Sequence, residues 1–221
     1  MKRFEIIRPV MLLTLFIFLI PLMNSCSSAY YGAMEKIGIH KRDILVDRVE
    51  DARDAQAEAQ EQFKSALEQF SSVVQVEDTD LKKAYEKLNF EYEQSEESAR
   101  NVSDRIDKVE SVAEALFKEW ESELELYKSN ELRNASSKQL RETRERYSKM
   151  LQSMHQAESS MTPVLRTFRD NVLFLKHNLN AQAIGSLRME FKNLKGEIDR
   201  LIIKMNTAID TSNSFISNLE K

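Results

Sequence analysis

Few side chains in this 221-residue sequence have the types and spacing that chemistry requires. The chain has one cysteine, Cys26, and three histidines, His40, His155 and His177. A thiol can act as a nucleophile or accept an acyl chain, and histidines in helical bundles ligate metals through Glu-x-x-His pairs. No histidine here has a glutamate three residues before it, and no HExxH, Cys-x-x-Cys, GxGxxG or P-loop pattern occurs. We therefore expect no catalytic residue, no metal site and no cofactor.

Cys26 follows a segment typical of a secretory signal. Three basic residues occur in the first eight, and the run Val10–Ile20 (VMLLTLFIFLI) is apolar except for one threonine. Pro21 ends this run, which has about half of the ~20 residues that a membrane-spanning helix needs. A permanent anchor over Ile6–Met23 would have to include Arg8 and Pro21, and it is the second interpretation.

The MNSCSS stretch around Cys26 resembles the bacterial lipobox, in which the signal is cut before the cysteine and the thiol is acylated. Ser25 suits the small position, whereas Met23 replaces the usual leucine and Asn24 is atypical. Ser27, rather than aspartate, follows the cysteine, which by the Gram-negative sorting rule predicts the inner leaflet of the outer membrane. The alternative is an ordinary cleavage site nearby, with Cys26 removed or left as a free thiol. Because no second cysteine exists, no disulfide within one chain is possible.

The composition predicts long helices. The chain has four glycines and three prolines, with no glycine between Gly38 and Gly185 and only Pro163 after the signal. Turns depend on these two residue types, so a chain this poor in both has few turns. Residues 1–25 carry a net +2 and the whole chain −4, which leaves about −6 after cleavage. An acidic protein is a poor partner for nucleic acid and for broad adsorption to anionic lipid.

From Asp43 onwards, apolar residues recur at alternating spacings of three and four, which is the coiled-coil period of 3.5. Three polar breaks interrupt the pattern: the DTD stretch at 78–80, NELRNASS at 130–137, and the turn at 178–180. The breaks predict four helices, near 43–76, 80–129, 137–178 and 181–219.

Short connections force neighbouring helices to run antiparallel. We therefore predict an all-α fold, an elongated antiparallel four-helix coiled-coil bundle. The expected domains are a signal peptide (1–25), a lipidated cysteine with its tether (26–42), and the bundle (43–221).

Folding the second helix onto the third about residue 132 places Trp120 opposite Arg144. Four glutamates at positions 119–125 then approach Lys138 and Arg141, so we expect an ion-pair or cation–π cluster. Glu123, Arg144 and Glu158 fall on seam positions. They would set the register, extend to the edge of the seam, or form a buried polar site, and the sequence does not decide between these.

The stretch YYGAMEKIGIHKRDILVDRVEDARDAQ at residues 30–56, and FLKHNLNAQAI later on, resemble an uncharacterised bacterial family of predicted lipoproteins, a domain of unknown function. The resemblance covers nearly the whole mature chain and implies no activity. It does mark two characteristic segments, His40–Asp43 and Leu175–Asn180, which the predicted topology places at opposite ends of the bundle.

We therefore expect a non-enzymatic envelope lipoprotein that faces the periplasm and presents a helical scaffold to an unknown envelope protein. The candidate interaction residues are His40, Lys41 and Arg42 at one end and His177, Asn178 and Asn180 at the other. A self-assembling or membrane-shaping coiled coil, with a possible homo-oligomer, is the main alternative. A carrier of apolar ligands is a further one, although large residues such as Phe63 and Phe168 favour a filled interior.

Overall fold

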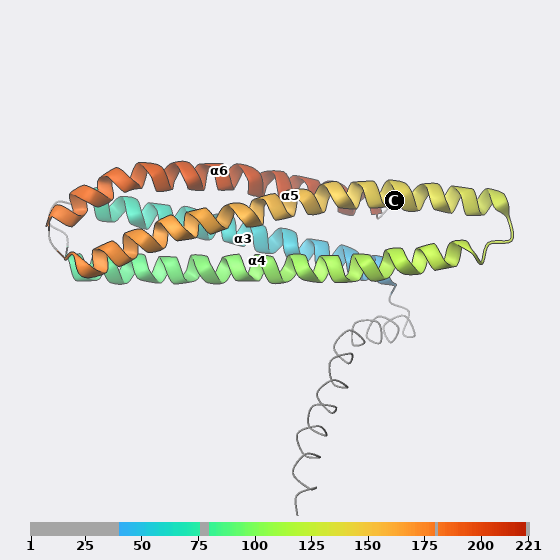
Figure 1. Cartoon of the computed structure of the whole chain (residues 1–221), viewed down its shortest axis with the longest axis horizontal. Coiled ribbons are helices and arrows are strands. Elements are labelled where there is room, and N and C mark those ends of the chain that lie inside the picture. Colours follow the sequence, from blue (N-terminus) through green and yellow to red (C-terminus); the bar gives the residue numbers. More distant parts are fainter. Residues whose placement is uncertain (1–39, 76–79, 180, 220–221) are drawn as a thin grey trace, which may run out of the picture.

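The computed structural model describes residues 40–75, 80–179 and 181–219. The predicted signal peptide, Cys26, nearly all of the tether and Asn180 lie outside these residues. Within them the chain forms four helices and no strand: α3 (Lys41–Gln75), α4 (Leu81–Leu124), α5 (Asn130–His177) and α6 (Ala181–Leu219) (Figure 1). The predicted all-α class is confirmed.

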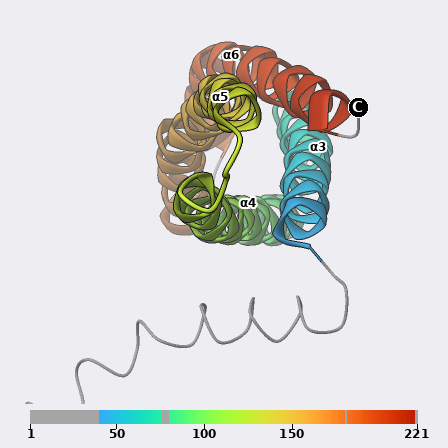
Figure 2. The ribbon, with the colours of Figure 1, turned by 90° about the vertical axis from the view of Figure 1, so that its right-hand side faces the viewer.

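Consecutive helices run in opposite directions, and seen along the rod the four helices surround one shared interior (Figures 1 and 2). Each helix packs against the one before it and the one after it, and α6 closes the ring by packing on α3. Hydrogen bonds between helices show the antiparallel register, because residue numbers rise along one helix as they fall along its neighbour. Examples are Arg105–Asp51 (3.1 Å) and Gln62–Glu91 (2.8 Å) between α3 and α4, and Arg53–Asn213 (3.2 Å) and Gln60–Asn206 (2.8 Å) between α3 and α6.

The heptad pattern explains why these helices form a bundle. Residues that recur every three and four positions lie on one face of a helix, so burying that face removes a continuous apolar stripe from water. Most of the predicted seam residues are buried in the interior, among them Leu45, Val49, Phe63, Phe70, Leu88, Val102, Ile106, Met154, Phe168, Leu175, Leu194, Ile198, Leu201 and Met205.

Aromatic rings fill the interior in the half of the rod that contains the α5–α6 turn. The ring of Phe70 lies 5.8 Å from that of Phe191 in a stacked arrangement and 6.2 Å from that of Phe168. The Tyr92 ring meets Phe168 edge-on at 6.0 Å. Offset and edge-on pairs of this kind add to the stabilisation that comes from burial alone.

Two of the three predicted breaks are correct. Asp80 caps α4, since its side chain accepts the backbone N–H of Lys83 (3.2 Å), and this bond lowers the pKa of the Asp80 carboxyl. α5 ends at His177, where the N–H of Asn178 donates to the carbonyl of Leu175 (3.2 Å), and α6 begins at Ala181.

The predicted boundary between the second and third helices is wrong. α4 ends at Leu124 instead of near 129, and α5 begins at Asn130 instead of 137. Ser129 caps α5 by accepting the N–H of Leu132 (3.3 Å), and Glu131 in the first turn complements the helix dipole. The NELRNASS stretch contains neither glycine nor proline, so once Ser129 has started the helix nothing in the stretch ends it.

The four helices differ in length. α4 and α5 have 44 and 48 residues, whereas α3 and α6 have 35 and 39. At the end of the rod where α3 begins and α6 ends, α4 and α5 continue as a pair (Figure 1). Lys41, where α3 begins, bonds to Glu119 of α4, and Leu219, where α6 ends, lines the same groove as Thr143 of α5. Residues 120–142 therefore extend beyond the other two helices. At 1.5 Å per residue this overhanging hairpin is ~20 Å long.

Candidate interaction sites

The candidate residues at the start of α3 have different environments. His40 is exposed, and its carbonyl accepts the N–H groups of Asp43 (3.0 Å) and Ile44 (3.2 Å), which begins the helix. Lys41 is buried, and its Nζ donates to Glu119 Oε1 (2.9 Å). Arg42 is exposed and borders a groove at the base of the overhanging hairpin. Lys41 therefore ties α3 to α4, and Arg42 is the more accessible cation.

His177 and Asn178 lie where α5 ends, at the opposite end of the rod, as expected, and the third candidate there, Asn180, is outside the described residues (Figure 1). His177 is exposed at the last position of α5. Asn178 caps the helix, with its Nδ2 donating to the carbonyl of Phe174 (2.8 Å). The amide of Asn178 therefore shapes the turn, while His177 is free to face a partner.

The ion-pair cluster predicted between α4 and α5 is present in part. Arg144 forms an ion pair with Glu121, and its guanidinium lies 5.2 Å from the centre of the Phe117 ring. The ring expected there was Trp120, and that expectation is wrong. Trp120 instead donates from Nε1 to Ser136 Oγ (2.8 Å), because α5 begins earlier than predicted and brings Ser136 opposite the indole.

Glu123, Arg144 and Glu158 do not form a common buried site. Glu123 is exposed and lines the groove of the overhanging hairpin. Arg144 is half-buried in its pair with Glu121, and Glu158 is half-buried in a separate cluster further along the rod.

That cluster is centred on His155 and joins α4 to α5. The imidazole Nδ1 lies 2.9 Å from Glu158 Oε2, and Nε2 lies 3.3 Å from Glu110 Oε1. Glu158 also accepts a hydrogen bond from Ser103 Oγ. Burial lowers the pKa of His155, but hydrogen bonds to the two carboxylates outweigh it, so the pKa is raised overall. The sequence offered only the spacing of three between His155 and Glu158; Glu110 and Ser103 come from another helix.

This cluster makes the stability depend on pH. A histidine whose pKa is raised in the folded state stabilises it below its unfolded pKa of ~6.5, and the contribution disappears as the pH rises through the folded pKa. We expect His155→Gln to lower the urea midpoint more at about pH 5.5 than at about pH 8.5. His177→Gln, at an exposed position, is the control. An equal effect of His155→Gln at both pH values would contradict the prediction.

A groove opens where the overhanging hairpin leaves the bundle. It has a volume of about 480 Å³. Its lining includes Leu116 and Trp120 of α4, Tyr127 of the loop that follows, and Leu132, Ala135 and Gln139 of α5. Leu132 is 60% exposed and Leu126, in the adjoining loop, 77%. The same face of the hairpin packs on α3 and α6 further along, so here it is an apolar face whose covering helices have ended.

Neither end of the rod supplies a metal site or a spanning helix within the described part of the chain. No group of three or more His, Cys, Asp and Glu side chains there is arranged to hold an ion. Each described helix is too polar to cross a lipid bilayer.

Comparison with known proteins gives a family without a function. Residues 30–219 match a family described as protein of unknown function (DUF2959). No curated protein matches the chain.

Proposed function

This chain belongs to the DUF2959 family, whose description names no activity, so we propose its function from its own surfaces. The proposed function is that of a non-enzymatic envelope lipoprotein whose helical rod presents docking surfaces to other proteins. The N-terminal pattern around Cys26 supports the lipid anchor, on the inner leaflet of the outer membrane. The four-helix rod supports the scaffold, because it holds surfaces far apart on a rigid body.

The observation that carries the docking role is the groove of the overhanging hairpin. Elsewhere this face of α4 and α5 is covered by α3 and α6, so its shape suits another helix laid along it. Glu123 lies exposed on its α4 edge, and Arg42 of α3 and Arg146 of α5 line the same groove. We therefore propose that the partner inserts an amphipathic helix that carries charges of both signs beside its apolar stripe.

In-cell photo-crosslinking tests this docking site. A photoreactive residue at Leu132 or Gln139, inside the groove, is expected to capture one defined envelope protein. Arg141 is the matched control, because it belongs to the same hairpin but lines a different, shallower surface with Glu121 and Leu124. Identical products from all three positions, or none from the groove, would refute the proposal.

The lipid anchor has its own test. Cells labelled with palmitate are expected to incorporate the label into the wild-type chain but not into Cys26→Ala, and only the wild type should sediment with membranes. Equal labelling of both chains, or a soluble wild type, would refute the lipid anchor. The proposal that the groove is a docking site would not be affected.

Self-assembly is the alternative use of the same groove. Two copies would then bury the same apolar face, lined by Trp120 and Leu132, against each other. We propose a different protein as the partner instead. Crosslinks from Leu132 to a second copy of this chain, together with a dimer in sedimentation at micromolar concentration, would reverse this choice.

A further inference from the structure

The α5–α6 hairpin around the turn, residues 162–204, has the opposite net charge to the rest of the chain. Residues 162–204 contain eight lysines and arginines and four aspartates and glutamates, a net +4, whereas the whole chain is −4. The rest of the sequence therefore carries −8. The acidity that disfavours broad adsorption to anionic surfaces does not extend to this hairpin.

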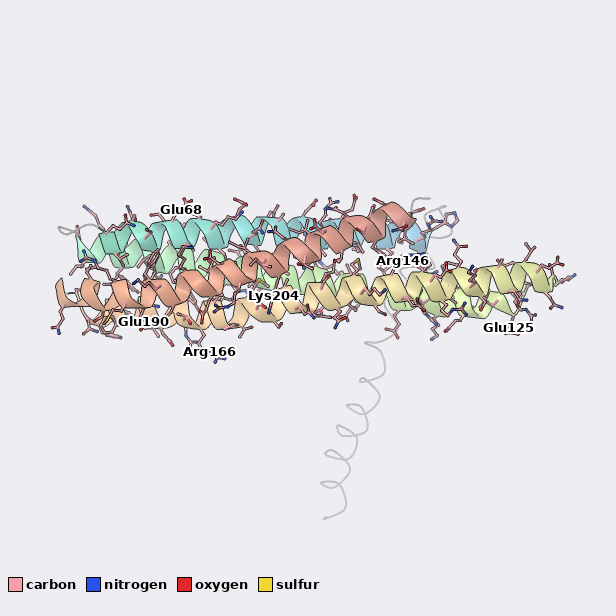
Figure 3. The ribbon with its side chains drawn as sticks, turned by 90° about the horizontal axis from the view of Figure 1, so that it is seen from above. Glu68, Glu125, Arg146, Arg166, Glu190 and Lys204 are labelled. Atoms are coloured by element: carbon pink, nitrogen blue, oxygen red, sulfur yellow. The ribbon has the colours of Figure 1, made fainter. Side chains whose placement is uncertain are left out.

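Most of these cations are exposed and not engaged in ion pairs. Arg166, Arg169, Lys176, Lys192 and Arg200 are exposed, and none forms an ion pair with another residue of the described chain. Figure 3 shows Arg166 on the flank of this end of the rod. The remaining cations have partners: Lys195 pairs with Asp199, Arg188 donates to the carbonyl of Val74, and Lys204 donates to Ser160.

Large apolar side chains are exposed among these cations. Leu173, Phe174, Leu179 and Met189 are 44%, 39%, 50% and 69% exposed. Leu179 lies in the turn itself, and Phe174 and Met189 come from the two facing helices and line one groove. Exposed apolar residues that gather in one place mark a binding surface rather than ordinary surface composition.

We propose that this distal surface, made by residues 166–179 and 182–200 on either side of the α5–α6 turn, binds the face of a membrane that contains anionic lipid. The cations would lie at the phosphate level, and Leu173, Phe174, Leu179 and Met189 would enter the boundary between head groups and acyl chains. Basic residues that flank exposed apolar side chains are the chemistry that peripheral membrane binding uses.

A lipid surface fits these features better than an acidic protein does. The exposed apolar side chains come from both helices and from the turn between them, and Asp170 and Glu190 line the groove that Phe174 and Met189 share, which disfavours an acidic protein side chain in it. A membrane needs no complementary shape, only charge and apolar side chains that reach it. The two carboxylates beside the groove moderate the attraction and make it dependent on the density of anionic lipid.

Vesicle co-sedimentation of residues 26–221 carrying Cys26→Ser, which include the whole bundle, tests the proposal. The chain is expected to bind vesicles of equal parts phosphatidylglycerol and phosphatidylcholine, to ignore pure phosphatidylcholine, and to dissociate at ~0.5 M NaCl, where charges are screened within a few ångströms. The variant Arg166→Glu, Lys176→Glu, Lys192→Glu is expected to bind roughly 100-fold more weakly.

The matched control reverses three exposed cations near the other end, Lys138→Glu, Arg141→Glu and Lys149→Glu, and so changes the net charge equally. It is expected to bind like the wild type. A second variant, Leu173→Ser with Met189→Ser, keeps every charge and is expected to bind the anionic vesicles more weakly than the wild type at low salt. The proposal would be overturned if both charge variants lost vesicle binding equally, if the chain bound neutral vesicles, or if it bound no vesicles at all. If a photoreactive residue at His177 captured a protein while the chain bound no vesicles, the surface would be assigned to an acidic protein.

Discussion

Replacing Phe168 by alanine is expected to lower the free energy of unfolding by about 3–5 kcal/mol, because its ring fills the interior of the bundle. Phe168 is fully buried, and its ring contacts those of Phe70 and Tyr92 at 6.2 and 6.0 Å. Alanine would leave a cavity between the helices, which close-packed neighbours fill only in part. Urea denaturation followed by circular dichroism measures the change.

Phe90→Ala is the matched control, because Phe90 is 57% exposed on α4. Removing a ring from such a position usually changes stability by less than about 0.5 kcal/mol. If the two substitutions lowered the urea midpoint equally, the aromatic cluster would not be a packed interior, and the antiparallel register of the four helices would be in doubt.

Replacing Gln56 by methionine is expected to change stability by a smaller amount and in the opposite direction. Gln56 is fully buried on the seam of α3, and neither its Oε1 nor its Nε2 has a hydrogen-bond partner among the described residues. Leaving polar atoms buried without partners costs about 1–3 kcal/mol, and methionine keeps an unbranched side chain of similar size. We expect the free energy of unfolding, measured by urea denaturation, to rise by a similar amount.

Gln60, one helical turn further on, provides the control. It is also buried, but its Nε2 donates to Asn206 Oδ1 (2.8 Å) and to the carbonyl of Ile202 (3.3 Å). Gln60→Met removes both bonds, and although the exposed Asn206 can bond to water instead, the substitution should be neutral or destabilising. A stabilising Gln60→Met, or a destabilising Gln56→Met, would contradict the hydrogen-bond pattern. A single buried polar seam residue commonly fixes register at a cost in stability, and Gln56 fits that role.

The sequence predicted the helices well because their cause is local. The period of 3.5 residues, the cap at Asp80 and the turn after His177 are all features of neighbouring residues. The error at residues 130–136 also has a local cause. This polar stretch was interpreted as a loop, although it contains no glycine or proline that would end a helix. Ser129, a single capping residue, moved the boundary by seven positions from the predicted 137 to Asn130.

The candidate sites were less predictable, because they depend on how helices align. The groove beside Trp120 exists only because α3 and α6 end before α4 and α5 do, and no residue of the hairpin encodes that difference. Glu110, the partner of His155 on α4, depends on a register that the wrong boundary had shifted. Lys41 was predicted to be an accessible cation but is buried. Its partner Glu119 is 78 residues away in the sequence, so the pairing could not be foreseen from neighbouring residues.

The unequal helix lengths also give the rod a mechanical character. Resistance to bending rises steeply with the cross-section of a beam, so the two-helix segment beyond Lys41 and Leu219 is far more compliant than the four-helix segment behind it. A sideways pull on whatever occupies the Trp120 groove would flex the hairpin at that step and leave the remainder straight. The molecule thus joins a stiff four-helix segment to a flexible two-helix hairpin.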